Sequence, residues 1–253
     1  MSFTGEIESE ETPMNITVIN GTEQKGCTFA MKEIFLRAMG EGHNITEHFL
    51  PRDCLEFCTG CKACFFQDIS ICPHSQYTIP IWESILSADL IVFTSPTYVF
   101  HATGQVKALL DHLGTKWMAH SPEKPMFRKQ AVIITNAIGQ GMGKTARDIK
   151  DSLDFWGIAR TYIIKQALFQ PKWELVSVQI KAAVKSKCER VAKSVKSRTN
   201  IKPRFKIRVL FFIMKTAQIM IDKSERKAGR ERTKDYLHWK ENGWLDGKKP
   251  WRD

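Results

Sequence analysis

From Asn15 to about Val195 the sequence alternates short β-branched runs with longer segments in which apolar residues recur every three or four positions. This alternation is typical of βα units and a parallel sheet. Strands are predicted at Asn15–Ile19, Asn44–Phe49, Leu90–Thr94, Ala131–Thr135 and Thr161–Ile164. Helices are predicted at Thr28–Met39, Ile81–Ala88, Gly104–Leu113, Lys144–Phe155 and Glu174–Val195. We therefore expect an α/β fold with a doubly wound five-stranded parallel sheet over residues 14–198.

The last of these helices carries a single apolar stripe. Its members are Val176, Ile180, Val184, Cys188, Val191 and Val195. Residues at this spacing lie on one side of a helix and can cover a sheet face. Cys188 is therefore interpreted as a buried structural thiol.

The ends of the chain differ from this pattern. Residues 1–13 are acidic and lack the basic start and apolar run of a secretory signal, so a solvated, disordered tail is expected. Residues 199–253 are predicted to form a basic helical extension. Its apolar run Phe205–Ile221 is interrupted by Lys206 and Lys215, which argues against a membrane span. Docking of this helix on the main domain or a second subunit is favoured over a position on a membrane. The aromatic-rich segment 235–251 is expected to pack irregularly.

Composition changes this picture only in part. The 253 residues carry a formal charge of +11, with most of the excess after Lys181. We interpret that charge as a solvated helical surface. No nucleic-acid partner is expected, because no known nucleic-acid-binding motif accompanies the basic residues. Seven cysteines without an export signal indicate reduced thiols in a cytoplasmic protein.

Three loops follow predicted strands one, three and four, where ligands of open parallel sheets bind. The first has glycines, hydroxyls and a helix start, which together suit an anion. Cys27 stands where a nucleotide-triphosphate loop would need lysine, so a monophosphate such as that of FMN fits better. The second contains Tyr98 and Phe100, which can flank a planar ring. The third, residues 136–143, is rich in glycine and allows close backbone approach.

Four cysteines within fifteen residues form the most specific chemical feature: Cys58, Cys61, Cys64 and Cys72. Two consecutive CxxC steps suit a soft metal or an iron–sulfur cluster, although the third gap is longer than in ferredoxins. Cys54 is either a spare thiol or an alternative ligand, and the first is favoured. His74 permits a zinc site with mixed ligands, but a surface position is expected for a lone loop histidine.

These motifs resemble the flavodoxin-like NAD(P)H-dependent FMN reductase superfamily, and within it the iron–sulfur flavoproteins. The resemblance covers about Asn15 to Val195, and Gln24 stands where the family commonly has arginine. It implies that Thr22, Gln24, Gly26, Cys27 and Thr28 hold the FMN phosphate. It also implies that the isoalloxazine ring lies between Pro96, Thr97, Tyr98, Val99 and Phe100 on one side and Asn136, Ala137, Gly139 and Gly141 on the other. The four cysteines of the run would hold a [4Fe–4S] cluster.

The leading hypothesis is an FMN-dependent NAD(P)H oxidoreductase that passes electrons, through the cluster if one is present, to a small-molecule or protein acceptor such as a ferredoxin-like protein. No catalytic acid or base is identified, because the flavin carries the chemistry. A cluster-free reductase of quinones, azo or nitro compounds and a non-catalytic flavodoxin-type carrier are the alternatives. The resemblance also implies a homo-oligomer.

Overall fold

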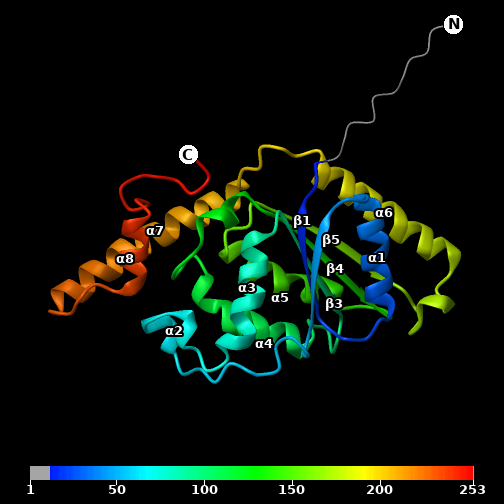
Figure 1. The fold of residues 1–253 in the computed structure, drawn as a ribbon, viewed down its shortest axis with the longest axis horizontal. Helices are drawn as coiled ribbons and strands as arrows, with labels where there is room; N and C mark the ends of the chain where they lie inside the picture. Colours follow the sequence, from blue (N-terminus) through cyan, green and yellow to red (C-terminus); the bar gives the residue numbers. More distant parts are fainter. Residues whose placement is uncertain (1–11, 253) are drawn as a thin grey trace, which may run out of the picture.

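The computed structural model describes residues 12–252 (Figure 1). Five parallel strands form one sheet in the order β2-β1-β3-β4-β5. Their bounds are β1 Asn15–Asn20, β2 Asn44–Phe49, β3 Leu90–Pro96, β4 Gln130–Ala137 and β5 Arg160–Ala167. The order reverses beside β1, as in doubly wound folds. The predicted flavodoxin-like α/β fold is confirmed, while the acidic tail prediction lies outside the described residues except for Thr12 and Pro13.

The helices begin and end at somewhat different residues from those predicted. Their bounds are α1 Cys27–Met39, α2 Ala63–Phe66, α3 Ser75–Ser87, α4 Gly104–His112, α5 Met142–Phe155, α6 Val178–Lys196, α7 Phe205–Lys227 and α8 Lys234–Glu241. The predicted start of α3 at Ile81 is wrong, because the helix runs through Pro80 and begins at Ser75. Pro80 removes the hydrogen bond to the Gln76 carbonyl, but the helix continues because Ile81, Trp82 and Ile85 after it are buried in the core.

Helices cover both faces of the sheet and form two cores. On one face α1 and α6 pack through Met31, Phe35 and Val184 against Val18 and Val92. On the other face α3, α4 and α5 enclose a second apolar cluster around the strands. Alternate residues of each strand point to opposite faces, which accounts for the nearly continuous apolar strands. Cys188 is fully buried in the first core, and its raised pKa of about 12 follows mainly from that burial.

The C-terminal extension packs on the main domain through a third apolar cluster. Ile207 and Phe211 of α7 contact Met118 and Phe127 of the domain, and Trp239 of α8 stacks on Phe211 with ring centroids 4.9 Å apart. Docking of the predicted α7 segment is thus confirmed for one of its faces. The expectation of an irregular tail is wrong at its start, because residues 234–241 form α8. Thr233 caps this helix by accepting from the Tyr236 backbone.

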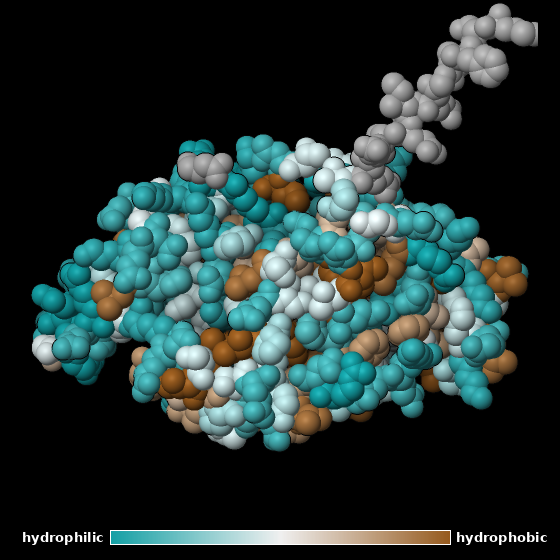
Figure 2. All heavy atoms as spheres, viewed as in Figure 1, coloured by the Kyte–Doolittle hydropathy of each residue, from teal (hydrophilic) through white to brown (hydrophobic). Residues whose placement is uncertain are grey.

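The surface matches the charge distribution of the sequence. Figure 2 shows that hydrophilic side chains cover most of the face in view, with separate hydrophobic patches between them. Many of the basic residues of α6 and α7 are exposed. Within residues 12–252 no helix has the combined length and apolarity needed to cross a bilayer.

Candidate flavin site and cysteine segment

Asn136, near the end of β4, joins the three predicted ligand loops. Its side-chain oxygen accepts a short hydrogen bond from the Thr28 hydroxyl at the start of α1. Its backbone oxygen accepts from the Thr97 backbone N–H at 2.8 Å. Strands β3 and β4 extend further than predicted, so Pro96 and Asn136 pair directly in the sheet register. The first, second and third loops therefore meet at one point on the carboxyl edge.

The first loop, residues 21–26, ends at an uncapped helix. Gly26 is the residue before α1, and no side chain bonds the first-turn N–H groups. A Cβ at Gly26 would meet nothing within 4 Å, so open space lies in front of the helix start. The Thr22 hydroxyl accepts from the Gln24 backbone at 2.8 Å and orders the turn. Free N–H groups and the helix dipole make this place suitable for a phosphate.

Cys27 makes a different contact from the one its predicted role suggests. Its buried thiol donates to the Pro171 carbonyl oxygen at 3.7 Å. Burial, followed by the nearby Glu174 carboxylate, raises the pKa of this thiol. The side chain of Cys27 therefore anchors α1 to the segment after β5, and only its backbone N–H lies in the row available to a phosphate.

The second loop is a tight turn from Tyr98 to His101. The backbone groups of these two residues bond each other at 2.9 and 3.0 Å. Between them, Val99 and Phe100 adopt left-handed backbone angles, with φ of 48° and 67°. The Asp148 carboxylate on α5 fixes the turn by accepting from the Ala102 N–H at 2.9 Å, and it lies 3.0 Å from His101 Nδ1. Strained residues held this firmly often mark ligand sites.

Gly141 of the third loop fits tightly against this turn. A Cβ there would lie 2.7 Å from Thr97 Cγ2 and 2.9 Å from Phe100 Cα, and its φ is 101°. Gly139, two residues earlier, would carry a Cβ with nothing within 4 Å. One glycine therefore permits close packing of the loops, whereas the other borders open space.

An aromatic side chain after β5 was not predicted. Phe169 is 65% exposed, and its backbone N–H donates to the Ile138 carbonyl oxygen at 2.9 Å. With Tyr98 and Phe100 it surrounds the carboxyl edge with exposed apolar groups. The rule that located the other loops applies equally to the end of β5 and could have identified Phe169.

The cysteine segment begins after β2 on the same edge of the sheet, and α2 within it lies near α8 (Figure 1). Cys58 and Cys61 are exposed, and Cys64 and Cys72 are half-buried. Burial and then the charges of Cys72, Cys58 and Cys61 raise the pKa of the Cys64 thiol. Of these four cysteines, only Cys72 belongs to a group whose ligand atoms lie within 4.8 Å of one another in the described part of the chain.

Cys54 is more deeply buried than these four thiols. Its pKa is raised to about 11, chiefly by that burial and also by the nearby Cys72. Burial suits a structural thiol, and the interpretation of Cys54 as a spare thiol stays a prediction.

A histidine pair lies beside Cys72. His74 Nδ1 and His112 Nε2 are 2.9 Å apart, and the ligand atoms of Cys72, His74 and His112 all lie within 4.8 Å of one another. The His112 Nδ1–H donates to the Ala108 carbonyl at 2.9 Å, which leaves Nε2 of the neutral ring as an acceptor. The expectation of a surface position for His74 is wrong, because its ring packs on the buried His112. The three side chains form a possible mononuclear metal set.

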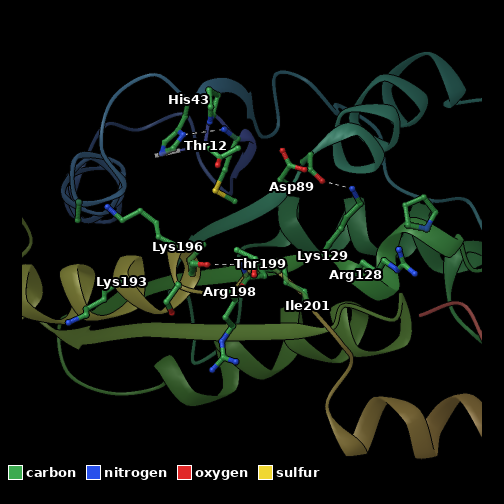
Figure 3. A pocket seen from close by; sticks show the side chains of 18 of the residues that line it. Thr12, His43, Asp89, Arg128, Lys129, Lys193, Lys196, Arg198, Thr199 and Ile201 are labelled. Atoms are coloured by element: carbon green, nitrogen blue, oxygen red, sulfur yellow. Dashed lines mark hydrogen bonds between the residues drawn. The ribbon is translucent and has the colours of Figure 1, made fainter. Parts of the chain in front are cut away.

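A cavity of about 1080 Å³ opens at the opposite, amino edge of the sheet. Figure 3 shows lysines of α6 on one side of it and Lys129 beside Asp89 on the other. The Lys129 ammonium donates to the carbonyls of Leu86, at 2.7 Å, and of Ala88, and burial lowers its pKa. Cations are favoured at helix C-termini such as that of α3. The Lys129 ammonium lies at the C-terminal end of α3, and Lys193 and Lys196 lie in the last turn of α6. The helix dipoles therefore account for these lysines, and the cavity lies at the opposite edge of the sheet from the three flavin loops.

Comparison with known proteins identifies the family. The family model described as NADPH-dependent FMN reductase matches residues 14–172. The chain belongs to this family. The matched segment contains the FMN reductase fold, the three loops and the cysteine segment, and it excludes α6, α7 and α8. The resemblance inferred from the sequence motifs is confirmed.

Individual relatives agree with this assignment. An iron–sulfur flavoprotein of Archaeoglobus fulgidus is 31% identical over 99 residues, which cover 39% of this chain and 48%, about half, of that protein. A crystal structure of an azoreductase from Bacillus anthracis has a TM-score of 0.54 at 12% identity, with 72% of this chain and 99% of that one covered. A flavone reductase has a TM-score of 0.52 at 17% identity, with coverages of 75% and 65%. At such identities the structures show a shared fold.

Proposed function

We propose that this member of the FMN reductase family is an FMN-dependent oxidoreductase that takes hydride from NADH or NADPH and passes electrons to a small-molecule or protein acceptor. The observation that carries the proposal is the meeting of three loops at Asn136 beside an uncapped helix start. An FMN-dependent NADH-azoreductase of Bacillus anthracis, solved in complex with FMN, shares the fold at 13% identity and a TM-score of 0.54.

Different residues bind the phosphate and the ring of FMN in this proposal. The N–H groups at the start of α1 bind the phosphate, with Thr22 ordering the loop before them. The turn at Tyr98–Phe100 and the open side of the third loop at Gly139 would border the ring, and Phe169 would help to exclude water. Bound FMN supplies the capacity to accept a hydride and release single electrons. The protein's part is to orient the ring and leave one face open for the nicotinamide.

The cysteine segment is the second part of the proposal. Cys58, Cys61, Cys64 and Cys72 would hold a [4Fe–4S] cluster, which would supply one-electron transfer between flavin and acceptor. All four thiols are at least partly exposed, so they are accessible to an assembling cluster. The partial match to an iron–sulfur flavoprotein adds support, because that relative is named for an iron–sulfur centre.

Anaerobic purification tests both parts separately. The protein should bind FMN in a stoichiometric complex, oxidise NADH or NADPH, and contain iron with acid-labile sulfide. Failure to bind added FMN would contradict the flavin site. Flavin without iron or sulfide would leave a cluster-free reductase, and bound flavin without nicotinamide oxidation would indicate an electron carrier.

Metal analysis also distinguishes the second ligand set. Zinc without sulfide, lost on His112→Ala but retained on Cys58→Ala, would assign the metal to Cys72, His74 and His112. Iron and sulfide lost on Cys58→Ala would assign it to the cysteine run.

A further inference from the structure

Helix α7 has two apolar faces on opposite sides. One face, with Ile207, Phe211 and Gln218, is buried on the main domain, and the Gln218 side-chain N–H donates to the Ala119 carbonyl at 2.8 Å. The other face contains apolar side chains exposed by 38–80%. Its members are Phe205, Val209, Phe212, Ile213, Ile219 and Met220. At 100° per residue these six positions fall within about one third of the helix circumference, opposite the buried face.

Cations surround this exposed face. Arg208, Lys215 and Arg226 follow one edge of it, Lys206 lies on the other, and Lys223 continues the apolar line toward the end of the helix. The Lys249 ammonium of the C-terminal segment lies 5.9 Å from the Phe212 ring centroid and adds to this border.

The acidic residues of α7 do not offset these charges at the exposed face. Asp222 is buried and lies 3.4 Å from Arg232, and Glu225 forms two hydrogen bonds with Arg230. A two-fold contact between copies would bring two cationic borders together, and the described part of α7 offers no unpaired carboxylate to neutralise them. The charge pattern therefore argues against a second copy as the occupant.

We propose that the exposed face of α7 docks on an anionic lipid surface, with its apolar side chains in the headgroup boundary and its cations on the lipid phosphates. Helices with an apolar face bordered by lysine and arginine bind membranes in this orientation without crossing them. Each basic residue near an anionic surface strengthens binding through its attraction to the lipid phosphates. The proposal is independent of the flavin chemistry.

Flotation of the full-length, FMN-treated protein with lipid vesicles tests the proposal. The protein should float with equimolar phosphatidylcholine and phosphatidylglycerol, remain unbound with phosphatidylcholine alone, and dissociate as salt is raised. The double variant Ile213→Asp, Met220→Asp replaces two exposed apolar groups with carboxylates, and the double variant Lys215→Glu, Lys223→Glu reverses two charges. Each should weaken binding by roughly tenfold or more.

The control is Val178→Asp, which places the same charge at an exposed apolar residue at the start of α6. It should bind vesicles as the unchanged protein does, and thermal unfolding should show that all variants are folded. No binding to the anionic vesicles, or binding that the α7 variants leave intact, would overturn the proposal. Dimerisation that Ile213→Asp, Met220→Asp abolishes, without vesicle binding, would assign the face to a second copy and overturn it equally.

Discussion

Asn136 is central to the flavin site because two loops bond to it. The Thr28 hydroxyl donates to its side-chain oxygen, and the Thr97 N–H donates to its backbone oxygen. In Asn136→Ala the buried Thr28 hydroxyl loses its acceptor, and an unsatisfied buried group costs about 1–3 kcal/mol. We expect that loss in the free energy of unfolding measured with urea, together with weaker FMN binding. The double variant Thr28→Val, Asn136→Ala should lose less free energy of unfolding than the sum of the losses in the two single variants. Strict additivity would show that the bond contributes nothing.

Gly141 offers a sharper probe of the ring site. In Gly141→Ala the new methyl group would displace the turn at Phe100 and force a left-handed alanine, a strain of about 1–3 kcal/mol. We expect FMN affinity to fall by roughly tenfold, as measured by fluorescence titration. The matched control Gly104→Ala, at the start of α4 and outside the three loops, should have little effect, because its Cβ meets nothing. Equal effects of the two changes would place the ring elsewhere.

The buried Cys188 thiol makes the free energy of unfolding depend on pH in the alkaline range. The unfolded thiol loses its proton near 9.0, whereas the buried thiol holds it to about 12. The folded state therefore binds more protons in this window, and stability falls as the pH rises through it. Cys188 alone should lower the free energy of unfolding by about 1.4 kcal/mol per pH unit above the lower value, and the buried Cys54 adds to this slope up to its own pKa of about 11.

Urea titrations from neutral to alkaline pH measure this slope. Cys188→Ala should be less stable at neutral pH but should show a shallower decline, while Cys58→Ala, which alters an exposed thiol, should retain the original slope. An unchanged slope in Cys188→Ala would contradict the account of this thiol.

At the scale of elements, the C-terminal extension contacts the cysteine segment. The Lys234 ammonium at the start of α8 donates to the Cys64 carbonyl at 3.2 Å, and the adjacent Asp235 lies 2.9 Å from His120. The His120 ring in turn packs edge-on against Phe65 of α2 at 4.6 Å between centroids. The extension therefore limits the motion of α2.

Asp235→Asn should weaken this contact without disturbing the sheet. We expect faster hydrogen exchange of the amides in α2, by several-fold, and unchanged exchange in β3 and β4. Asp246→Asn alters an exposed carboxylate of the same extension and serves as the control. Faster exchange throughout the domain would mean that Asp235 supports the fold as a whole.

The elements that sequence reasoning predicted best are those set by local apolar periodicity. The five strands and the α6 stripe follow from that pattern because strand and helix periods differ. Helices α2 and α8 were missed because their four and eight residues are too short for a period to emerge. Their stability comes from contacts such as that of Trp239 with Phe211, which join residues distant in sequence.

At the site, sequence reasoning placed the loops but not their contacts. The loop positions followed from the rule for strand ends, whereas the bond from Thr28 to Asn136 spans 108 positions and leaves no local pattern. Likewise His112 lies 38 positions from His74, so a lone loop histidine could not reveal its partner.

For the whole molecule, the central claim is that the carboxyl edge of the sheet binds FMN in a position open to a nicotinamide. The most direct measurement is anaerobic stopped-flow absorbance of the FMN-loaded protein mixed with NADPH or NADH. The account predicts that the bound flavin bleaches faster than free FMN at the same concentration, and that Gly141→Ala, loaded at saturating FMN, slows the bleaching while Gly104→Ala does not. Flavin that fails to bind, or that bleaches no faster than free FMN with either nucleotide, would contradict it.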